Sequence, residues 1–454
     1  MHDLTQGSIT RHLIRLAVPI AAGMVFQTLY YLVDLYFVAR LGDAAIAGVS
    51  AAGNVQFIIM ALTQVLGIGT MVLIAHAAGR KDRADANLVF NQSLLMAACC
   101  ALVVLGGGYL LAGRYMAGLG ADAATAAAGT SYLHWFLPGL GLQFALVVMG
   151  SGLRGTGIVK PTMVVQMATV LLNAILAPIL IAGWLTGRPL GVAGAGLASS
   201  IAILAGVLLL LAYFLRLEKF VGFDRAMFRP RRETWGRILK VGLPPGGEFA
   251  LMFVFIGVIY LIIRDFGAAA QAGYGIGSRV MQAIFLPAMA IAFAVAPLAG
   301  QNVGAGLPDR AWLAFRKAAL LGGGVMFLLT LLCQWQPEWF IRRFTTEAEV
   351  VAIGGDFLRI ISWNFVASGI IFTCSGMFQA LGNTLPSLVS GASRLVTFVI
   401  PAVWLSGRPG FALRQVWIVS VVTVALQALT SLWLLRRELH RRAAPPAAVS
   451  PTRA

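Results

Sequence analysis

Charged side chains are scarce in this sequence. Only 11% of its 454 residues are charged, whereas 59% are hydrophobic and the mean hydropathy is +0.85. A water-soluble domain of this length needs more charged residues to cover its surface. The composition therefore excludes a soluble globular protein and indicates a chain that lies mostly in lipid.

Cysteines and catalytic motifs are almost absent as well. The four cysteines lie in apolar segments and show neither CxxC nor histidine-paired metal spacing, which indicates packing residues. No Ser/His, paired-Asp or HExxH constellation occurs within the apolar segments, so an intramembrane enzyme is not expected. No phosphate loop or nucleotide fingerprint occurs either, so the sequence predicts neither a bound cofactor nor transport driven by ATP.

Long apolar runs dominate the sequence instead. Separated by charged or Gly/Pro-rich breaks, they predict an all-α integral membrane protein with twelve transmembrane helices. The first run has no signal-peptide cleavage pattern behind it and is interpreted as a retained helix. The predicted spans lie near 13–38, 45–75, 88–112, 131–153, 161–183, 191–214, 238–262, 271–299, 315–335, 357–378, 385–405 and 412–434.

An internal repeat runs through the chain at a constant offset of 225 residues. The segment ARLGDAAIAG, which begins at Ala39, aligns with RDFGAAAQAG, which begins at Arg264. In the same register, LRGTGIVKP at Leu153 aligns with FQALGNTLP at Phe378. A single register over this length predicts two structurally similar halves.

The repeat and the breaks define the expected organisation. Two six-helix lobes, 1–215 and 238–435, are joined by a basic cytoplasmic linker at 216–237 and followed by a disordered basic tail at 436–454. Each half has an even number of spans, so the pseudo-twofold axis lies along the membrane normal. Such folds place a substrate cavity between the lobes, which rock to open it to either side.

The net charge of +17 is explained by the membrane topology. Most Lys and Arg residues fall in the loops that share a side with both termini, which predicts that both termini are cytoplasmic. We therefore expect a multi-pass protein of the cell inner or plasma membrane, acting as a monomer. No nucleic-acid partner is needed to account for the charge.

Two carboxylates lie inside apolar segments. Of the 17 acidic residues, only Asp34 and Glu248 do so, and a carboxylate in hydrocarbon rarely persists without a task. Asp34 shares a helix face with Gln27 and with Tyr30 or Tyr31, which predicts a polar face directed into the bundle.

The surroundings of Glu248 predict the kind of substrate. Met252 and Phe255 continue its helix face as an apolar, polarizable wall that suits a bulky amphiphilic cation. Arg279 is the clearest basic residue inside a span, and either an ion pair with a carboxylate or a snorkelling side chain would explain it. A structural hydrogen bond between helices remains the alternative role for either carboxylate.

Competition for one carboxylate is a sufficient mechanism of antiport. A coupling ion that discharges the carboxylate also expels a cationic substrate. Pro19 lies in the same span as Asp34, and Pro244 occupies the matching position of the second half. Because proline removes a backbone hydrogen bond, both positions are predicted hinges.

Several segments together resemble the multidrug and toxic compound extrusion (MATE) transporters of the MOP flippase superfamily. The resemblance covers nearly the whole chain and rests on LIRLAVPIAAGMVFQTLYYLVDLYFVARLGDAAIAGVS, GVAGAGLASS, AGQNVGAG and MFQALGNTLPS. It implies a twelve-helix transporter that exports organic cations, dyes and drugs in exchange for protons or sodium.

The resemblance also assigns ion-coupling roles. It implies that Asp34, Asn173, Ser199 and Glu248 take part in ion coupling, with sodium as a candidate ligand of Asp34 and Asn173. Ala177 stands where members with a sodium-type site carry a second aspartate, which leaves few hard oxygen ligands and favours protons. His76 replaces a glutamine that its counterpart Gln301 retains, and His76 has no assigned role.

The alternative function is a flippase or exporter of lipid-linked or anionic metabolites from the same superfamily. Such a protein is expected to line its cavity with several Arg or Lys residues. Within the predicted spans Arg279 is nearly alone, which favours the cation exporter.

Overall fold

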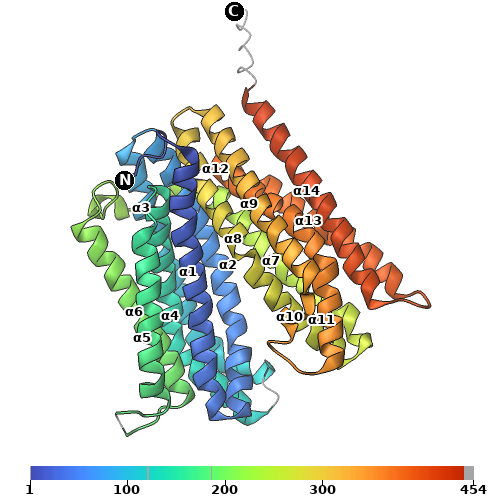
Figure 1. Cartoon of the computed structure of the whole chain (residues 1–454). Coiled ribbons are helices and arrows are strands. Elements are labelled where there is room, and N and C mark those ends of the chain that lie inside the picture. Colours follow the sequence, from blue (N-terminus) through green and yellow to red (C-terminus); the bar gives the residue numbers. More distant parts are fainter. Residues whose placement is uncertain (1, 120–121, 186, 444–454) are drawn as a thin grey trace, which may run out of the picture.

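The computed structural model describes residues 2–119, 122–185 and 187–443. Within these ranges the regular elements are all helices, and they form two bundles that stand side by side (Figure 1). Among the described residues, twelve helices are long and apolar enough to cross a membrane. The predicted all-α, twelve-span architecture is therefore confirmed.

The first lobe contains six long helices that alternate in direction, and a 3₁₀ turn, η1 (Ala39–Leu41), follows the first of them. The helices are α1 (Ile9–Val38), α2 (Asp43–Gly79), α3 (Arg83–Leu119), α4 (Ala123–Gly155), α5 (Lys160–Ile181) and α6 (Val192–Arg216). All twelve predicted spans fall on such helices, which mostly extend a few residues beyond the predicted bounds.

The second lobe repeats this pattern with one difference. Its tenth span is built from two helices joined by the 3₁₀ turn η4 (Ser362–Asn364), and η3 (Arg264–Phe266) follows the first helix. The helices are α7 (Arg232–Ile263), α8 (Ala268–Gly304), α9 (Pro308–Trp335), α10 (Pro337–Ile341), α11 (Ala348–Ile361), α12 (Phe365–Leu381), α13 (Leu385–Ser406) and α14 (Leu413–Ala443).

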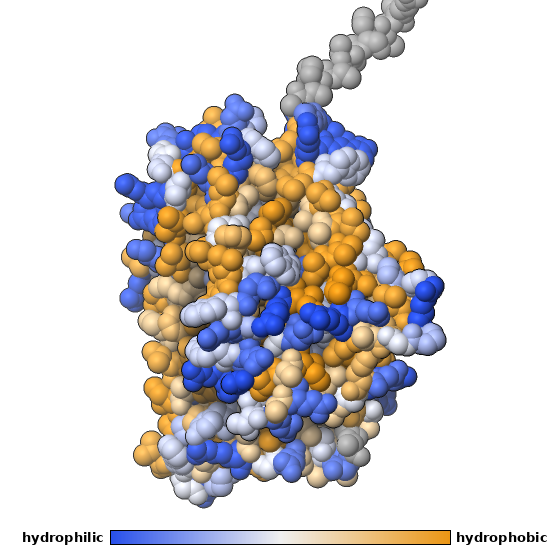
Figure 2. Space-filling view, turned by 45° about the vertical axis from the view of Figure 1, so that its right-hand side comes forward, coloured by the Kyte–Doolittle hydropathy of each residue, from blue (hydrophilic) through white to orange (hydrophobic). Residues whose placement is uncertain are grey.

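The surface agrees with a lipid environment. Figure 2 shows hydrophobic residues over a broad zone of the visible face. Hydrophilic residues lie at its upper end, where α14 ends, and also across its middle and lower parts. Large apolar side chains such as Leu102, Leu110 and Leu328 are exposed on the outer surfaces of the helices. In water this surface would be unfavourable, whereas in a bilayer it contacts acyl chains.

The lobes meet where α2 and α8 cross near the end of the molecule that carries both termini. A Cβ at Gly79 would lie 2.0 Å from the carbonyl oxygen of Gln301, and a Cβ at Gly304 would lie 2.2 Å from that of His76. These four residues are two pairs at the repeat offset of 225, so the crossing is itself pseudo-symmetric. Only glycine permits this approach of two backbones.

The side chains at this crossing also bind across the lobes in a symmetric way. His76 Nε2 donates to the carbonyl oxygen of Ala380 (2.7 Å), and Gln301 Nε2 donates to that of Gly155 (3.0 Å). Ala380 and Gly155 are themselves repeat equivalents. His76 thus makes the same kind of interlobe contact as Gln301, its equivalent in the second half.

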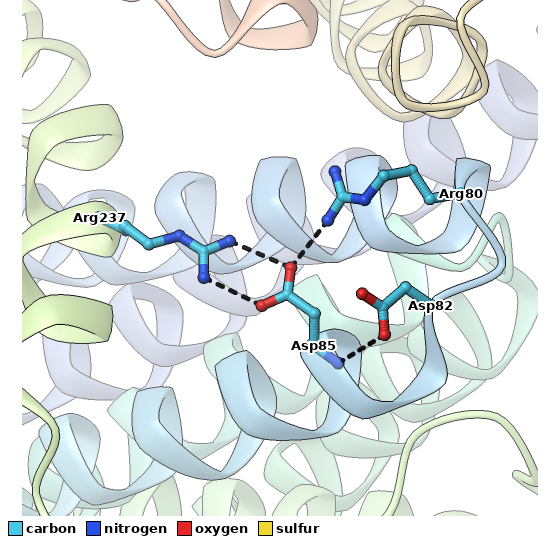
Figure 3. Close-up of polar contacts among 4 residues, drawn as sticks. All are labelled: Arg80, Asp82, Asp85 and Arg237. Carbon is cyan, nitrogen blue, oxygen red and sulfur yellow. Dashed lines mark hydrogen bonds and ion pairs between the residues drawn. The ribbon is translucent and has the colours of Figure 1, made fainter.

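A cluster of charges joins the lobes beside this crossing (Figure 3). Arg237 of α7 binds both carboxylate oxygens of Asp85 of α3 (2.9 and 3.0 Å), and Arg80, directly after α2, binds the same carboxylate (2.8 Å). The backbone N–H of Asp85 donates to Asp82. Bidentate guanidinium–carboxylate pairs are stronger than single contacts because two charged hydrogen bonds form at once.

The linker between the lobes is shorter than the predicted 216–237, because α7 begins at Arg232. Its last residues, 232–237, already belong to α7, and a 3₁₀ turn, η2 (Arg225–Phe228), lies before them. Asn91 and Gln92 of α3 hold its backbone, the latter by donating to the carbonyl oxygens of Met227 and Arg229. Buried amides of the first lobe therefore fix the linker against it.

The prediction of a disordered tail was wrong for residues 436–443, which continue α14. Asn383 donates to Glu438 (3.0 Å), Arg442 pairs with Glu438 (3.1 Å), and Arg442 also donates to the carbonyl oxygen of Leu381 (2.6 Å). These contacts hold the last two turns of the helix against the end of α12. Residues 444–454 of the predicted tail lie outside the described residues.

We expect the Asp85–Arg237 pair to stabilise the contact between the lobes. Its side chains are 16% and 38% exposed, so solvent screening reduces its contribution to about 1 kcal/mol. A double-mutant cycle of Asp85→Asn and Arg237→Gln, followed by thermal unfolding, measures this coupling. The Glu338–Arg342 pair, at 48% and 68% exposure, is the control and should give less than about 0.5 kcal/mol. Equal coupling energies in the two cycles would contradict the assignment.

Candidate functional site

Asp34 is buried near the far end of α1. Only 9% of its surface is exposed, and the hydroxyl of Tyr132, on α4, makes a hydrogen bond with its carboxyl group. Its Oδ1 is buried without a hydrogen-bond partner. One oxygen of a desolvated carboxyl group is thus left for a ligand.

Two further polar side chains of the first lobe are buried without partners. Asn173 of α5 and Ser199 of α6 are 0% and 1% exposed, and neither the amide atoms of Asn173 nor the Ser199 hydroxyl has a hydrogen-bond partner. Helices α1, α5 and α6 pack on one another. Orphaned polar atoms are rare inside proteins, so these three residues, none of them more than 9% exposed, indicate a candidate binding site.

The same three residues lie at similar depth. A helix rises by about 1.5 Å per residue, so Asp34 lies about 6 Å before the end of α1 at Val38. By the same measure, Asn173 lies about 12 Å before the end of α5 at Ile181. Ser199 follows the start of α6 by about 10 Å. Because α6 runs opposite to α1 and α5, all three residues lie in the half of the lobe remote from the termini.

The predicted polar face of α1 is partly buried. Gln27 and Tyr30 are both half-buried, and Gln27 lies about two turns from Asp34. The side chain of Tyr31 lies outside the described residues. Within the described part of the chain, no three His, Cys, Asp or Glu side chains gather as a set of metal ligands.

Glu248 sits in a different chemical setting, near the middle of α7. Its Oε2 accepts a hydrogen bond from Ser375 of α12 (3.4 Å), and Ser387 of α13 binds the Ser375 hydroxyl (2.9 Å) and the carboxyl group. Its Oε1 is buried without a partner. Two serines from neighbouring helices orient this carboxyl group and leave one oxygen for a ligand.

The two carboxylate sites are not copies of each other. Glu248 lies about 22 Å before the end of α7 at Ile263, whereas Asp34 lies only about 6 Å before the end of α1 at Val38. The two carboxyl groups therefore lie at different distances from the side of the molecule where α1 and α7 end. At the repeat offset, the positions that match the three polar residues of the first lobe carry Ile259, Phe398 and Val424. The fold is duplicated, whereas the polar chemistry of the lobes differs.

A half-buried arginine of the second lobe, Arg394, is a functional candidate that the sequence patterns do not single out. Arg394 of α13 stacks over the ring of Phe255, 4.2 Å from its centroid, and its Nε is buried without a partner. No ion pair involves Arg394 within the described residues. Its isolation from carboxylates in an apolar segment could have marked it in the sequence.

The remaining predicted residues divide between exposed and packed positions. Met252 is 46% exposed, whereas Phe255 packs against Phe398 at a centroid distance of 4.7 Å as well as against Arg394. Arg279 is exposed on α8 and forms no ion pair with a described residue. The guanidinium buried among second-lobe helices is therefore that of Arg394, not Arg279.

Both predicted hinge prolines lie inside unbroken helices. Helix α1 runs through Pro19 and α7 through Pro244 and its neighbour Pro245. Each proline removes one backbone hydrogen bond from its helix. Bending at these positions stays a prediction.

Comparisons with known proteins match the entire architecture. The multidrug export protein MepA of Staphylococcus aureus (strain MSSA476) is 26% identical over 448 residues, which cover 97% of each chain. A MOP superfamily transporter from Pyrococcus furiosus superposes with a TM-score of 0.90 at 24% identity, covering 97% of this chain and 98% of that one. An outward-facing multidrug resistance MATE family transporter gives a TM-score of 0.89 at 24% identity and the same coverage. These structural likenesses support the fold.

The family model described as MatE matches the chain twice, at residues 19–179 and 244–405. The matched segments begin at Pro19 and Pro244, which confirms the repeat register read from the sequence. Together they cover well over half of the chain, and the family consists of transporters, so the expectation of a transporter instead of an enzyme is confirmed. The chain belongs to the MatE family of multi-pass membrane transporters.

Proposed function

We propose that this protein is a secondary active antiporter that exports bulky organic cations in exchange for protons. The observation that carries the proposal is two carboxyl groups within the helix bundles, those of Asp34 and Glu248, each with one buried oxygen that lacks a partner. The staphylococcal relative is a multidrug export protein, and a structural neighbour is a multidrug resistance transporter. Both support the export of several compounds.

Competition for a carboxyl group couples the two fluxes. A desolvated carboxylate needs a counter-charge, which either a proton or an organic cation supplies. When a proton binds, the attraction for the cation is lost and the cargo leaves. When the cation binds, the proton leaves. Each carboxyl group therefore holds either a proton or the cation when the site changes the side to which it opens.

The donor set of the first lobe favours protons over sodium. Asp34, Asn173 and Ser199 offer one carboxylate, one amide oxygen and one hydroxyl. Ala177, which is fully buried in α5, supplies no second carboxylate. Sodium prefers several hard oxygen ligands, so it would need water or backbone carbonyls to complete its shell, whereas a proton needs only the carboxylate.

The topology fits export from the cytoplasm. The basic loops, the linker, the start of α1 and the end of α14 lie on one side of the molecule. The positive-inside rule assigns this side to the cytoplasm. On this assignment, the α2–α8 crossing closes the cytoplasmic end, and the polar residues of the first lobe lie towards the outside. Since both lobes belong to one chain, a monomer suffices.

Bending of α1 at Pro19 is the step that we propose links protonation to movement. Asp34 lies in the same helix, fifteen residues or about 22 Å further along. Loss of charge on Asp34 weakens its hydrogen bond with Tyr132, because a neutral carboxyl group accepts less strongly than a carboxylate. The released helix can then bend where proline leaves a carbonyl without its N–H partner.

A second candidate function, export of anionic compounds, is favoured by one observation. Arg394 is a guanidinium whose Nε is buried without a partner, and it could pair with an anionic group of a substrate. The contact of its guanidinium with the ring of Phe255 already stabilises part of its positive charge, which reduces its need for an anionic partner. Two unpaired carboxyl groups against one such guanidinium make the cation exporter the better account.

Proton-driven transport is testable in reconstituted vesicles. We expect a fluorescent organic cation to accumulate inside vesicles with an acidic interior and little accumulation when only a sodium gradient is imposed, because protons discharge both carboxyl groups. Collapse of the pH gradient by an ionophore is the control. Accumulation driven by sodium alone would overturn proton coupling, and uptake of an anionic dye with exclusion of the cation would favour the second candidate.

Neutralising the carboxyl groups should weaken cation binding. Asp34→Asn and Glu248→Gln keep the shape of the side chain but remove the counter-charge, so each should lower affinity for the cation by about tenfold, or about 1.4 kcal/mol. Equilibrium binding to purified protein measures this effect. Asp265→Asn, at an exposed acid in η3, is the matched control and should bind as the parent does. Unchanged affinity in both site variants would remove the proposed sites.

A further inference from the structure

A basic cavity of about 370 Å³ opens at the terminal end of the first lobe, away from the carboxyl groups. The N-terminal segment, the start of α1, the α4–α5 turn, the start of α5 and the end of α6 form its walls. The side chains that bear charge or titrate there are those of His2, His12, Arg15, Lys160 and Tyr213. No carboxylate belongs to this lining.

We infer that this cavity binds the phosphate group of an anionic membrane lipid. Arg15 and Lys160 are exposed cations without a carboxylate partner among the described residues. Asp3 lies close in sequence, but its carboxylate accepts hydrogen bonds from the backbone N–H and the hydroxyl of Thr5 (2.9 and 2.5 Å). Basic pockets at the cytoplasmic rim of helix bundles suit lipid phosphates.

The hydrogen-bonding groups around the cavity also fit an anion. His12 donates through Nε2 to the carbonyl oxygen of Gln6 (2.6 Å), and its Nδ1, which is buried without a partner, can donate to an anion when both ring nitrogens carry a proton. Arg15 lies 3.4 Å from Nε2 of His2, which leaves the other ring nitrogen of His2 to donate elsewhere.

The cavity already carries a positive potential. Burial, followed by the charge of Arg15, lowers the pKa of His2, and His12 acts in the same direction. The ring centroids of the two histidines are 5.5 Å apart. A bound phosphate would relieve this repulsion between like charges.

A lipid fits the surroundings better than a soluble phosphate. Apolar side chains on the adjoining helix exteriors are strongly exposed, with Val18 at 60% on α1, Val164 at 49% on α5 and Leu215 at 69% on α6. A second hollow, lined by Arg11 and Ile14 among others, shares Arg15 with the cavity and widens the basic rim. Acyl chains on this apolar surface would place a phosphate at the rim.

Lipid titration of the full-length protein in detergent tests this inference. Thermal unfolding is followed while phosphatidylglycerol, phosphatidylcholine or inorganic phosphate is added. We expect phosphatidylglycerol to raise the midpoint at concentrations where the other two have no effect, because only a ligand that binds the native state stabilises it. A rise caused equally by phosphatidylcholine would overturn the inference. A rise caused by inorganic phosphate alone would replace the lipid with a soluble anion.

Charge variants identify the cavity itself. Arg15→Gln with Lys160→Gln should weaken the apparent affinity for phosphatidylglycerol about thirtyfold, or about fivefold for each lost charge. Arg15→Gln with Lys160→Arg should recover about fivefold. The matched control, Lys317→Gln with Arg441→Gln, removes two exposed charges at the same end and should leave the affinity unchanged. Equal weakening in the control would reduce the effect to net charge and overturn the site.

Discussion

Inside a bilayer, a polar group has only the protein to bind, and this constraint governs both ends of the molecule. At the terminal end the demand is met across the lobes, where His76 binds Ala380 and Gln301 binds Gly155. Deeper in the lobes it is met only in part, because Asp34 and Glu248 each keep one oxygen without a partner. The groups that have hydrogen-bond partners hold the lobes together, and the oxygens without partners are free to bind a proton or a ligand.

The repeat explains the scaffold but not the polar chemistry. The α2–α8 crossing places Gly79 and Gly304 in equivalent contacts, so the repeat gives a nearly symmetric contact between the lobes. The polar residues do not follow this symmetry. The first lobe carries Asn173 and Ser199 besides Asp34, whereas the second lobe has two serines beside Glu248. Under the proposed function, a proton and an organic cation would therefore compete at two carboxyl groups with different surroundings.

The sequence alone predicts the fold well because lipid imposes long apolar segments, and the repeat then orders them. It also singles out Asp34 and Glu248, since a lone carboxylate is conspicuous in apolar surroundings. It does not predict their partners, because serine and tyrosine are common in membrane helices and their contacts come from helices far away in the chain. The equivalence of His76 and Gln301 likewise emerges only when both lobes are in place. The partners missed in this way are Tyr132, Ser375 and Ser387.

Proton release on substrate binding tests the central claim most directly, because it observes the exchange at the carboxyl groups without any gradient. Purified protein in weakly buffered detergent solution near neutral pH is mixed with a saturating organic cation, and a pH indicator records the released protons. The account predicts release of up to about one proton for each carboxyl group that the cation neutralises, and its loss when Asp34→Asn and Glu248→Gln are combined. Tight binding of the cation with no proton release between about pH 5 and pH 9 would contradict it.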